Sequence, residues 1–435
     1  MSIQLPEQFM ERMRQQLGDE LPAFLRALEE KPLRGIRMNP LKPGDAAGFI
    51  GNAEAVLWAD DAWYLSAESR AGASVIHEAG AFYIQEPGAM IPAAVLNAKP
   101  GEKILDLCAA PGGKSTQIGC AMKGEGLLVC NEPIPKRARI LSRNIERMGI
   151  PNAIVICAWP DRLAKQWPEG FDAVITDAPC SGEGMFRRDP ETRNEWSAEK
   201  AAGCALRQRE IIAAAARLVR PGGRLIYSTC TYNPEENEKN ARWFTEQFPE
   251  FRAEAFRLPG IEAPEGMFTC YPHRMKGEGQ FTALFRKAGN GEAVLQEDHS
   301  VMQASRQDTS AFETAFEGFP RATRQFGKTL VSIDELPDLT GIRTIRLGLH
   351  LGEIRGRTVI PDHAAALYFA APGMQVTDMS PEQAIRFTAG ETVPGDAEGW
   401  TLMRYRGLNI GWGKGSEGMI RNHYPKGLRN PYLIP

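Results

Sequence analysis

Hydrophobic and polar positions change their period several times along the chain. In residues 7–29 apolar side chains recur every three or four residues, which predicts an amphipathic helix interrupted near Pro22. Residues 33–42, LRGIRMNPLK, then alternate apolar side chains with Arg34, Arg37 and Lys42. This alternation predicts a half-buried edge strand whose basic side chains lie in solvent.

From about residue 76 short apolar runs alternate with helical patterns. The apolar runs are KILDLCA, GLLVCNE, AIVICA, FDAVITDAP and GRLIYSTCTY. Between them lie amphipathic stretches such as KRARILSRNIERMG and RQREIIAAAARLVR. This order predicts an α/β fold with a mostly parallel sheet covered by helices on both faces. In such a sheet the ligand lies outside the carboxyl ends of the strands.

The alternation of strands and helices ends near residue 288. Residues 289–310 are polar, poor in aromatic side chains and without steady periodicity, so we expect a linker. Beyond it, short apolar runs and glycine turns predict a β-rich domain. The expected division is an N-terminal α+β domain in residues 1–75, an α/β domain in 76–288, the linker, and a C-terminal region in 311–435.

Composition and charge narrow the class of protein. The hydrophobic content of 43% and the charged content of 24% are ordinary for a soluble globular protein. No apolar run reaches the roughly 20 residues of a membrane span, and the first residues do not resemble a signal peptide, so we expect no membrane partner. The cysteines form no C-x-x-C pair, which argues against a zinc site and favours the reducing cytoplasm. The net charge of −3 gives no indication of a nucleic-acid partner, although local basic clusters can still bind one.

The stretch LDLCAAPGGKST, residues 105–116, ends like a phosphate-binding P-loop. Gly113, Lys114 and Ser115 supply the end of that motif, but Cys108 stands where its first glycine is required. A nucleoside triphosphate is therefore not indicated. The small residues still allow a ligand to approach the backbone closely between a strand and a helix that opens near Lys114.

The second strand supplies a carboxylate for this ligand. GLLVCNE ends in Glu132, and its spacing from Gly113 matches the roughly 20 residues expected of an acidic group that binds a ribose. The loop lacks the G-x-G-x-x-G pattern, so a pyrophosphate has no full glycine cradle. A nucleoside without phosphates fits better, and S-adenosylmethionine is the obvious candidate.

Two further strand ends carry nucleophiles. Asp177 and Cys180 follow the fourth strand, and Cys230 follows the fifth, so the two cysteines are expected to converge over the ligand loop. A free cysteine is more often a small buried hydrophobic side chain. That interpretation is kept for the other cysteines considered, which are Cys120, Cys130, Cys157 and Cys204.

Four motifs together resemble a known family. CAAPGGKS, NEP, DAPCSGEGM and STCTYNPEENE look like motifs of the Sun-type family of RNA cytosine-C5 methyltransferases, in the same order and spacing over roughly residues 76–288. The tail GWGKGSEGMIRNHYPKGLR resembles the PUA-like domain of the bacterial branch that modifies small-subunit ribosomal RNA. The resemblance implies a Rossmann-like S-adenosylmethionine-dependent core between an N-terminal RNA-binding domain and a C-terminal PUA-like RNA-binding domain.

The resemblance also implies catalytic roles. Cys230 is the thiolate that adds to C6 of cytosine and so makes C5 nucleophilic. Asp177 relieves the charge that develops at N3, and Lys114 lowers the pKa of the thiol or donates to the base. Cys180 helps to remove the C5 proton, so that Cys230 can be eliminated.

The same resemblance implies a cofactor pocket. Its expected residues are Cys108, Ala109, Ala110, Pro111, Gly112, Gly113, Lys114, Glu132, Arg137, Asp161 and Asp177. Glu132 would hold the ribose hydroxyls. After the third strand this chain departs from the family pattern, so either Asp161 or Trp159 would contact the adenine. Gly88 likewise stands where a serine is common.

The expected partner is RNA, and 16S ribosomal RNA or the 30S subunit in particular, rather than DNA or a membrane. In the tail, basic side chains alternate with aromatic ones that could stack on bases: Trp412, Lys414, Arg421, His423, Tyr424, Lys426 and Arg429. The basic strand at residues 34–42 is a second, less favoured RNA surface. We expect a monomer.

Two other functions stay open at this stage. An amino-group methyltransferase usually presents D-P-P-Y or N-P-P-Y after the fourth strand, where this chain has DAPC. A catalytically silent RNA-binding paralogue would be expected to have lost a cysteine or the cofactor loop, and this chain has kept both.

Overall fold

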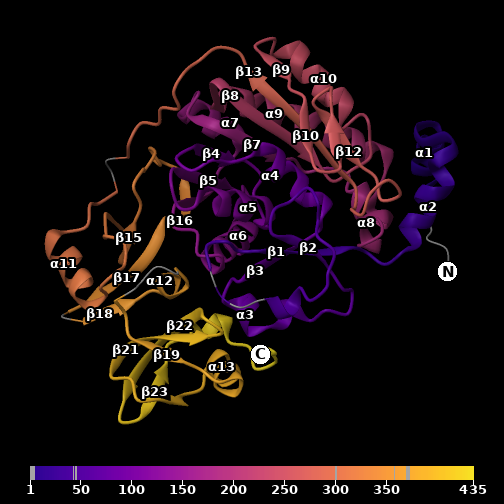
Figure 1. Ribbon diagram of the computed structural model, residues 1–435. Helices are drawn as coiled ribbons and strands as arrows, with labels where there is room; N and C mark the ends of the chain where they lie inside the picture. Colours follow the sequence, from indigo (N-terminus) through magenta and orange to yellow (C-terminus); the bar gives the residue numbers. More distant parts are fainter. Residues whose placement is uncertain (1–4, 43, 45–46, 299–300, 357, 369–372) are drawn as a thin grey trace.

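The computed structural model describes residues 5–42, 44, 47–298, 301–356, 358–368 and 373–435. Its largest sheet contains the predicted parallel strands in the order β8-β7-β4-β5-β6. These strands are β4 (Lys103–Asp106), β5 (Leu127–Asn131), β6 (Ala153–Cys157), β7 (Phe171–Asp177) and β8 (Val219–Thr229). The predicted α/β fold is confirmed, and the carboxyl ends of the strands meet at one edge of the sheet (Figure 1).

Helices cover both faces of this sheet, because neighbouring strand residues point to opposite sides. On one side Ile104 and Leu128 pack against α4 (Ile91–Leu96), α5 (Gly113–Met122) and α6 (Pro135–Arg147). On the other side Leu105 and Val129 pack against α7 (Pro160–Gln166), α9 (Ala198–Leu218) and α10 (Glu238–Gln247). Both faces of the strands are buried, so the runs read as continuously apolar rather than alternating.

Antiparallel strands extend the sheet at both edges. Strand β13 (Gln280–Lys287) pairs with β8. Both β12 (Met267–Cys270) and β9 (Phe251–Ala253) pair with β13. At the opposite edge, β16 (Arg343–Leu347) pairs with β6. The sequence places β16 in the C-terminal region, so this region adds a strand to the central sheet. The short hairpin β10 (Phe256–Leu258) and β11 (Ile261–Ala263) lies apart from the sheet.

The N-terminal region begins with the predicted helix, which is interrupted somewhat earlier than Pro22. Helix α1 (Glu7–Leu17) is followed by a 3₁₀ turn and by α2 (Leu21–Glu29), where Pro22 lies in the first turn. A small sheet follows, with β1 (Arg34–Met38) between β2 (Ala62–Leu65) and β3 (Phe82–Gln85), and α3 (Val75–Glu78) precedes β3. Strand β3 lies beyond the expected end of the N-terminal domain at residue 75.

The expectation of an edge strand with solvated basic side chains is wrong. Strand β1 is central in its sheet, and Arg37 and Lys42 are 3% and 7% exposed. Arg37 donates to the carbonyl of Gly113 and the hydroxyl of Thr116 at 3.1 and 2.9 Å. Lys42 donates to the carbonyls of Ala79 and Arg147. Both therefore satisfy carbonyl or hydroxyl oxygens inside the protein, and neither is available to solvent or to RNA.

The C-terminal region contains two further sheets, in agreement with the predicted β-rich domain. One sheet consists of β14 (Arg324–Phe326), β15 (Thr329–Ser332), β17 (Leu349–Arg355) and β18 (Thr358–Pro361). The other consists of β19 (Val376–Asp378), β21 (Gly399–Tyr405), β22 (Leu408–Ser416), β23 (Met419–Asn422) and β20 (Val393–Pro394). Helices α11 (Arg306–Ala315), α12 (His363–Leu367) and α13 (Pro381–Ala389) accompany them.

The end of the chain packs against the N-terminal region. Ile434 pairs with Ser74 in a parallel bridge, and Met403, Leu408 and Ile410 share an apolar cluster with Ile36. Figure 1 shows this closeness, with the yellow strands beside α3. Deleting the last sheet would therefore uncover apolar side chains of the N-terminal region, so point substitutions are the cleaner test of its function.

Residues 289–310, the predicted linker, include residues 299–300, which lie outside the described part of the chain. Helix α11 begins at Arg306, inside the predicted linker. The exact domain boundaries stay predictions. Among the described residues no helix is both long and apolar enough to cross a membrane.

Candidate active site

The loop that follows β4 is fixed by hydrogen bonds to the neighbouring strand ends. The amide of Ala109 donates to the carbonyl of Asn131, and the side chain of Asn131 donates to the carbonyls of Leu107 and Ala158 at 3.0 Å each. Asn131 lies at the end of β5 and is completely buried. The Asn131 side chain thus connects the end of β5 to the segments that follow β4 and β6. These hydrogen bonds fix the loop that the sequence predicts to bind the cofactor.

Glu132 lies directly after β5 with its carboxylate almost fully buried. Its Oε1 accepts the amide of Ile134 at 3.0 Å, and its Oε2 lies 3.0 Å from Nη1 of Arg137. Arg137 also donates to the carbonyl of Ala110 in the loop, at 3.1 Å. A carboxylate offers about four acceptor sites. Two of these are used here, so the group retains the capacity to accept the two hydroxyls of a ribose.

Lys114 and Asp177 form an ion pair at the carboxyl edge of the sheet. The Lys114 ammonium lies 2.7 Å from Asp177 Oδ2, with side-chain exposures of 10% and 34%. Burial alone would lower the pKa of Lys114, but the charge and hydrogen bond of Asp177 outweigh it, so the pKa is raised and the ammonium stays protonated. Ser228 donates to Asp177 Oδ1 at 2.8 Å, and Gln280 at 3.4 Å.

The two predicted nucleophiles meet, as expected. The Sγ atoms of Cys180 and Cys230 are 3.0 Å apart, and the amide of Cys230 donates to Cys180 Sγ at 3.3 Å. Both side chains are half-buried thiols. The hydrogen bond with Cys230, together with burial, raises the pKa of Cys180 well above its ordinary value. Because Asp177 precedes Cys180 by three residues and is bonded to Ser228, two residues before Cys230, the thiols and the ion pair belong to one site.

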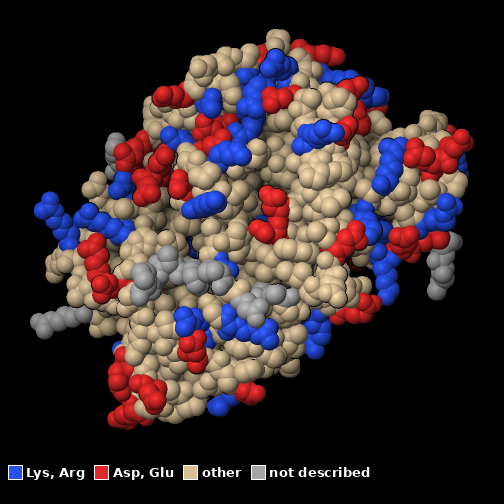
Figure 2. Space-filling view, viewed as in Figure 1, with Lys and Arg blue, Asp and Glu red and all other residues tan. Residues whose placement is uncertain are grey.

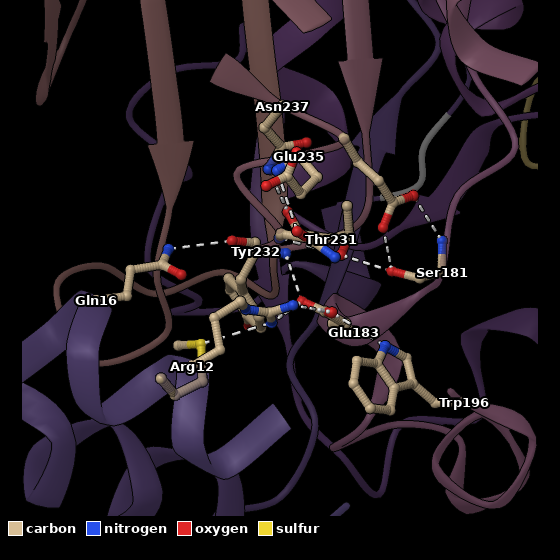
Figure 3. A network of polar contacts seen from close by, with 12 residues as sticks. Arg12, Gln16, Ser181, Glu183, Trp196, Thr231, Tyr232, Glu235 and Asn237 are labelled. Carbon is tan, nitrogen blue, oxygen red and sulfur yellow. Dashed lines mark hydrogen bonds and ion pairs between the residues drawn. The ribbon is translucent and has the colours of Figure 1, made fainter. Parts of the chain in front are cut away.

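A buried carboxylate fixes the two cysteine loops to each other. Glu236 accepts the amide and the hydroxyl of Ser181 at 2.9 and 2.5 Å, and Gln208 of α9 donates to it at 2.8 Å. The Ser181 hydroxyl lies 2.9 Å from that of Thr231. Figure 3 shows Ser181 and Thr231 within one polar network. Because they are the residues that follow Cys180 and Cys230, this network fixes the backbone next to both thiols.

Sequence reasoning missed these supporting residues. Ser181 lies inside the DAPCSGEGM motif, and Ser228, Thr231 and Glu236 lie inside STCTYNPEENE. Their presence beside the cysteines was the available signal. Gln280 gave no signal, because its strand reaches the site only through the antiparallel addition of β13.

Asp106 is a further buried acid that sequence reasoning missed. It ends β4 directly before the loop, is 1% exposed, and accepts the hydroxyl of Ser115 at 2.6 Å. Burial raises its pKa to about 7, opposed by the hydrogen bond from Ser115. The nearby charge of Asp177 raises the pKa of Asp106 further. The two acids differ in exposure, because Asp106 is buried while the side chain of Asp177 is 34% exposed.

The residues expected near an adenine lie in exposed positions. Trp159 is 73% exposed directly before α7. The Asp161 carboxylate is also 73% exposed and is paired with Arg217 at 2.8 Å.

Gly88 leaves little room for a serine, because a β-carbon there would lie 3.0 Å from Glu86 Oε2 and 3.1 Å from the carbonyl of Glu278.

Part of the predicted RNA surface of the tail is wrong. Trp412 and Tyr424 are 1% and 2% exposed and belong to apolar clusters, with the Trp412 indole donating to the carbonyl of Asp362. Neither ring can stack on a base. Lys414, Arg421, His423, Lys426 and Arg429 are exposed. Figure 2 shows basic and acidic side chains interspersed over the visible face, without a continuous basic area.

An aromatic group that the sequence did not indicate accompanies these basic residues. Trp400 of β21 is half-buried, its ring centre 4.5 Å from that of His423 and 5.5 Å from Nζ of Lys414. Burial and the charges of Lys414 and Arg421 lower the pKa of His423. Trp400 and Lys414 line a hollow of about 710 Å³ together with residues of α11 and β18. In this hollow an aromatic face and a cation are presented together.

A separate cavity of about 860 Å³ opens at the other end of the strands. Lys99, Glu102 and Arg224 line it, near the start of β4. Arg224 is bonded there to both oxygens of Glu102 at 2.7 Å. None of the predicted catalytic or cofactor residues lines this cavity, so its size does not make it the active site.

Known proteins match nearly the whole chain. The family model described as 16S rRNA methyltransferase RsmB/F matches residues 93–286, and the model of the N-terminal domain of RsmF matches residues 5–87. The model of the RsmF first C-terminal domain matches residues 310–369, and that of its PUA domain matches residues 375–430. Ribosomal RNA small subunit methyltransferase F of Escherichia coli K12 is 30% identical, over 98% of this chain and 97% of that protein.

Solved structures resemble about two thirds of the chain. A methyltransferase homologue from Pyrococcus horikoshii is 27% identical with a TM-score of 0.57, over 66% of this chain and 96% of its own. NSun6 from the same organism, solved with SFG, is 22% identical with a TM-score of 0.56, over 66% of this chain and 99% of its own. The second likeness shows the fold alone.

Proposed function

The chain belongs to the family of 16S rRNA methyltransferase F, and from this premise we propose that it methylates C5 of cytosine in 16S ribosomal RNA through a covalent adduct with Cys230. The methyl donor of the family is S-adenosylmethionine, which supplies an electrophilic methyl group when bound. The observation that carries the proposal is the 3.0 Å approach of two thiols beside the Lys114–Asp177 ion pair. A methyltransferase acting on an amino nitrogen needs no thiol.

Cys230 has the position and the chemistry of the nucleophile. Its thiolate adds to C6 of the cytosine, which breaks the C5–C6 double bond and leaves C5 able to attack an electrophile. Negative charge is then shared between C5 and N3 of the ring. The Lys114–Asp177 pair lies at the same strand ends. The Lys114 ammonium of this pair can supply positive charge and an N–H donor to the N3 edge of the base.

Asp177 is oriented for this contact by its neighbours. Lys114 occupies one of its oxygens and Ser228 the other, so the carboxylate is fixed while about a third of it remains exposed. In this arrangement Lys114 acts chiefly on Asp177 rather than directly on the thiol. A base that contacts Asp177 therefore meets a hydrogen-bonded, charge-balanced group that is oriented before the base arrives.

Cys180 is assigned to the final step. After methylation the C5 proton must be removed, the C5–C6 double bond must re-form, and the electron pair of the C6–S bond must return to Cys230. Cys180 Sγ lies next to the sulfur that leaves, at 3.0 Å, so it can assist the removal of this proton directly or through a water molecule. The raised pKa keeps Cys180 protonated during the attack. Its own proton can pass to the Cys230 sulfur, 3.0 Å away, as that sulfur leaves, and the Cys180 thiolate then accepts the C5 proton.

The function is tested by methylation of defined RNA. Purified protein is incubated with labelled S-adenosylmethionine and either naked 16S rRNA or assembled 30S subunits, and nucleosides are then identified by mass spectrometry. We expect 5-methylcytidine with a denaturant-resistant protein–RNA intermediate. N4-methylcytidine or a methylated adenosine would contradict the proposal, and the absence of any product with either substrate would favour a silent RNA-binding protein. We further propose that the protein acts as a monomer in the cytoplasm.

The cofactor pocket gives a first prediction. We expect Glu132→Ala to weaken S-adenosylmethionine binding by about 1.5–3 kcal/mol, the usual scale for hydrogen bonds to a charged group. Glu125→Ala, at the opposite end of β5 and exposed, is the matched control and should bind as the wild type does. Calorimetric titration measures both affinities. An affinity unchanged by Glu132→Ala would remove Glu132 from the pocket.

The tail gives a second prediction, about RNA binding. We propose that Lys414 and Arg421 contact phosphates and that the face of Trp400 stacks on an unpaired base. Replacing Lys414 and Arg421 by alanine should lower the slope of log K against log salt by roughly 0.7–0.9 for each lost phosphate contact, without changing cofactor affinity. The control removes two other exposed charges, Lys165 and Lys328. Equal slopes in the two double variants would show that this surface does not bind RNA.

A further inference from the structure

The carboxylate of Glu183 receives donors from three separate parts of the chain. Arg12 of α1 donates to both of its oxygens, at 2.8 and 2.6 Å. The indole of Trp196 donates to Oε1 at 3.0 Å, and the amide of Tyr232 donates to Oε2 at 3.2 Å. The side chain of Glu183 is fully buried, and Figure 3 shows these donors converging on it.

These contacts join the two loops that carry the cysteines. Glu183 follows Cys180 by three residues, and Tyr232 follows Cys230 by two. The amide of Gly184 also donates to the carbonyl of Cys230 at 2.9 Å. A movement of Glu183 therefore changes the path of both loops, and with it the separation of the two sulfur atoms.

The charge that balances Glu183 comes from outside the α/β domain. Arg12 lies 171 residues away in sequence, on the first helix, with its side chain 22% exposed. Gln16, one turn further along α1, donates to the carbonyl of Tyr232 at 3.0 Å. The same helix therefore contacts both cysteine loops.

Apolar packing fixes this helix in place. Phe9 is completely buried, and its ring centre lies 5.0 Å from that of Phe186 and 6.1 Å from that of Trp196. From the following helix, the carbonyl of Ala27 accepts a hydrogen bond from Arg187 at 2.9 Å. Because Phe186 and Arg187 continue the segment that begins with Cys180, the N-terminal helices hold this segment at several consecutive points.

We propose that α1 is a brace of the active site, and that Arg12 is a positioning residue which acts through Glu183 on the spacing of Cys180 and Cys230. The proposal rests on the function proposed above, in which the two thiols act in succession. A buried carboxylate is stable only when it is paired and hydrogen-bonded. Without Arg12, Glu183 must take up a proton or turn toward water, and either change weakens its bond to the amide of Tyr232.

The test compares Arg12→Ala with Arg14→Ala, which removes the same charge from an exposed position of the same helix. We expect kcat for methyl transfer to fall about 10- to 100-fold in Arg12→Ala, the range that a displacement of roughly 1 Å can produce. The KM for S-adenosylmethionine should change less than about twofold, because Arg12 does not contact the cofactor loop. Arg12→Lys, which keeps the charge, should recover activity to within about threefold of the wild type, and Arg14→Ala should resemble the wild type.

A second measurement does not depend on catalysis. Diamide oxidises two adjacent thiols to a disulfide while it is itself reduced to the hydrazine, and peptide mass mapping follows the Cys180–Cys230 product. We expect this disulfide to form several times more slowly in Arg12→Ala than in Arg14→Ala. Should the wild type fail to methylate cytosine, the proposed function fails, while the disulfide rate still tests the brace.

The outcomes are separable. The proposal would be overturned if the enzyme methylates RNA and either kcat for methyl transfer or the rate of disulfide formation is the same in Arg12→Ala and Arg14→Ala. Circular dichroism shows whether the variants are folded. If Arg12→Ala does not fold, Arg12→Lys is compared with Arg14→Lys instead. Both rates are then expected to be about threefold lower in Arg12→Lys.

Discussion

Replacing Cys230 by alanine is expected to abolish both methyl transfer and the covalent protein–RNA complex. Without the thiolate, C5 of cytosine is not activated for attack, so the rate should fall by about 10⁴-fold or more, as when other enzymes lose a covalent nucleophile. Binding of S-adenosylmethionine should persist, because Glu132 and the loop after β4 do not depend on this thiol. Denaturing gel electrophoresis and transfer of a labelled methyl group measure the two losses.

The control for this variant is a cysteine outside the site. Cys204 is 8% exposed on α9, and Cys204→Ala should keep most of the activity. A covalent complex that forms normally in Cys230→Ala would contradict the assignment of the nucleophile. It would transfer that role to Cys180, the other thiol within 3.0 Å.

Local sequence predicted which side chains meet at the carboxyl edge of the sheet, because the fold brings strand ends together. Asp177, Cys180 and Cys230 each follow a strand whose carboxyl end lies at one edge of the sheet, so their meeting depends only on strand order. The Lys114–Asp177 and Cys180–Cys230 contacts then follow from short loops. The cofactor roles of Glu132, Arg137 and Asp161 remain predictions, although the geometry places Glu132 and Arg137 against the loop.

Side chains whose environment is set by distant segments could not be predicted. The spacing of Arg37 and Lys42 is that of a solvated edge, but β2 and β3 enclose their strand, and the carbonyls that they bind come from α3, α5 and α6 or their ends. Trp412 likewise lies in a glycine-rich, basic sequence, yet Phe316 and Phe319, from the segment that follows α11, pack against it. Charge and aromatic content alone do not distinguish a surface from an interface between domains.

The partnership of Glu183 with Arg12 shows the same limit inside the active site. Arg12 lies in the amphipathic stretch of residues 7–29, and Glu183 lies between two glycines in DAPCSGEGM, so local sequence indicates no contact between them. Only the docking of α1 on the segment after Cys180 makes them a buried pair, with Phe9 and Trp196 excluding water. The N-terminal helices therefore contact the segments that carry both cysteines, while their role in RNA binding stays a prediction.

Cys180→Ala is expected to produce the opposite result to Cys230→Ala, because the two thiols act at different steps. Cys230 still adds to C6 and the methyl group is still transferred, but the C5 proton then leaves slowly. Assistance by a general base usually contributes about 10²- to 10⁴-fold, so the methylated adduct should last that much longer than a normal turnover. It should accumulate as a denaturant-resistant band shifted by the mass of the RNA.

The distinction from Cys230→Ala lies in what the trapped complex contains. With labelled S-adenosylmethionine, the band in Cys180→Ala should carry one methyl group for each bound RNA, because the block follows transfer. An unlabelled band would place the block before transfer and make Cys180 a partner in the attack. Adducts that accumulate in Cys230→Ala and not in Cys180→Ala would exchange the two roles, while the Lys114–Asp177 pair and the fold would remain as described.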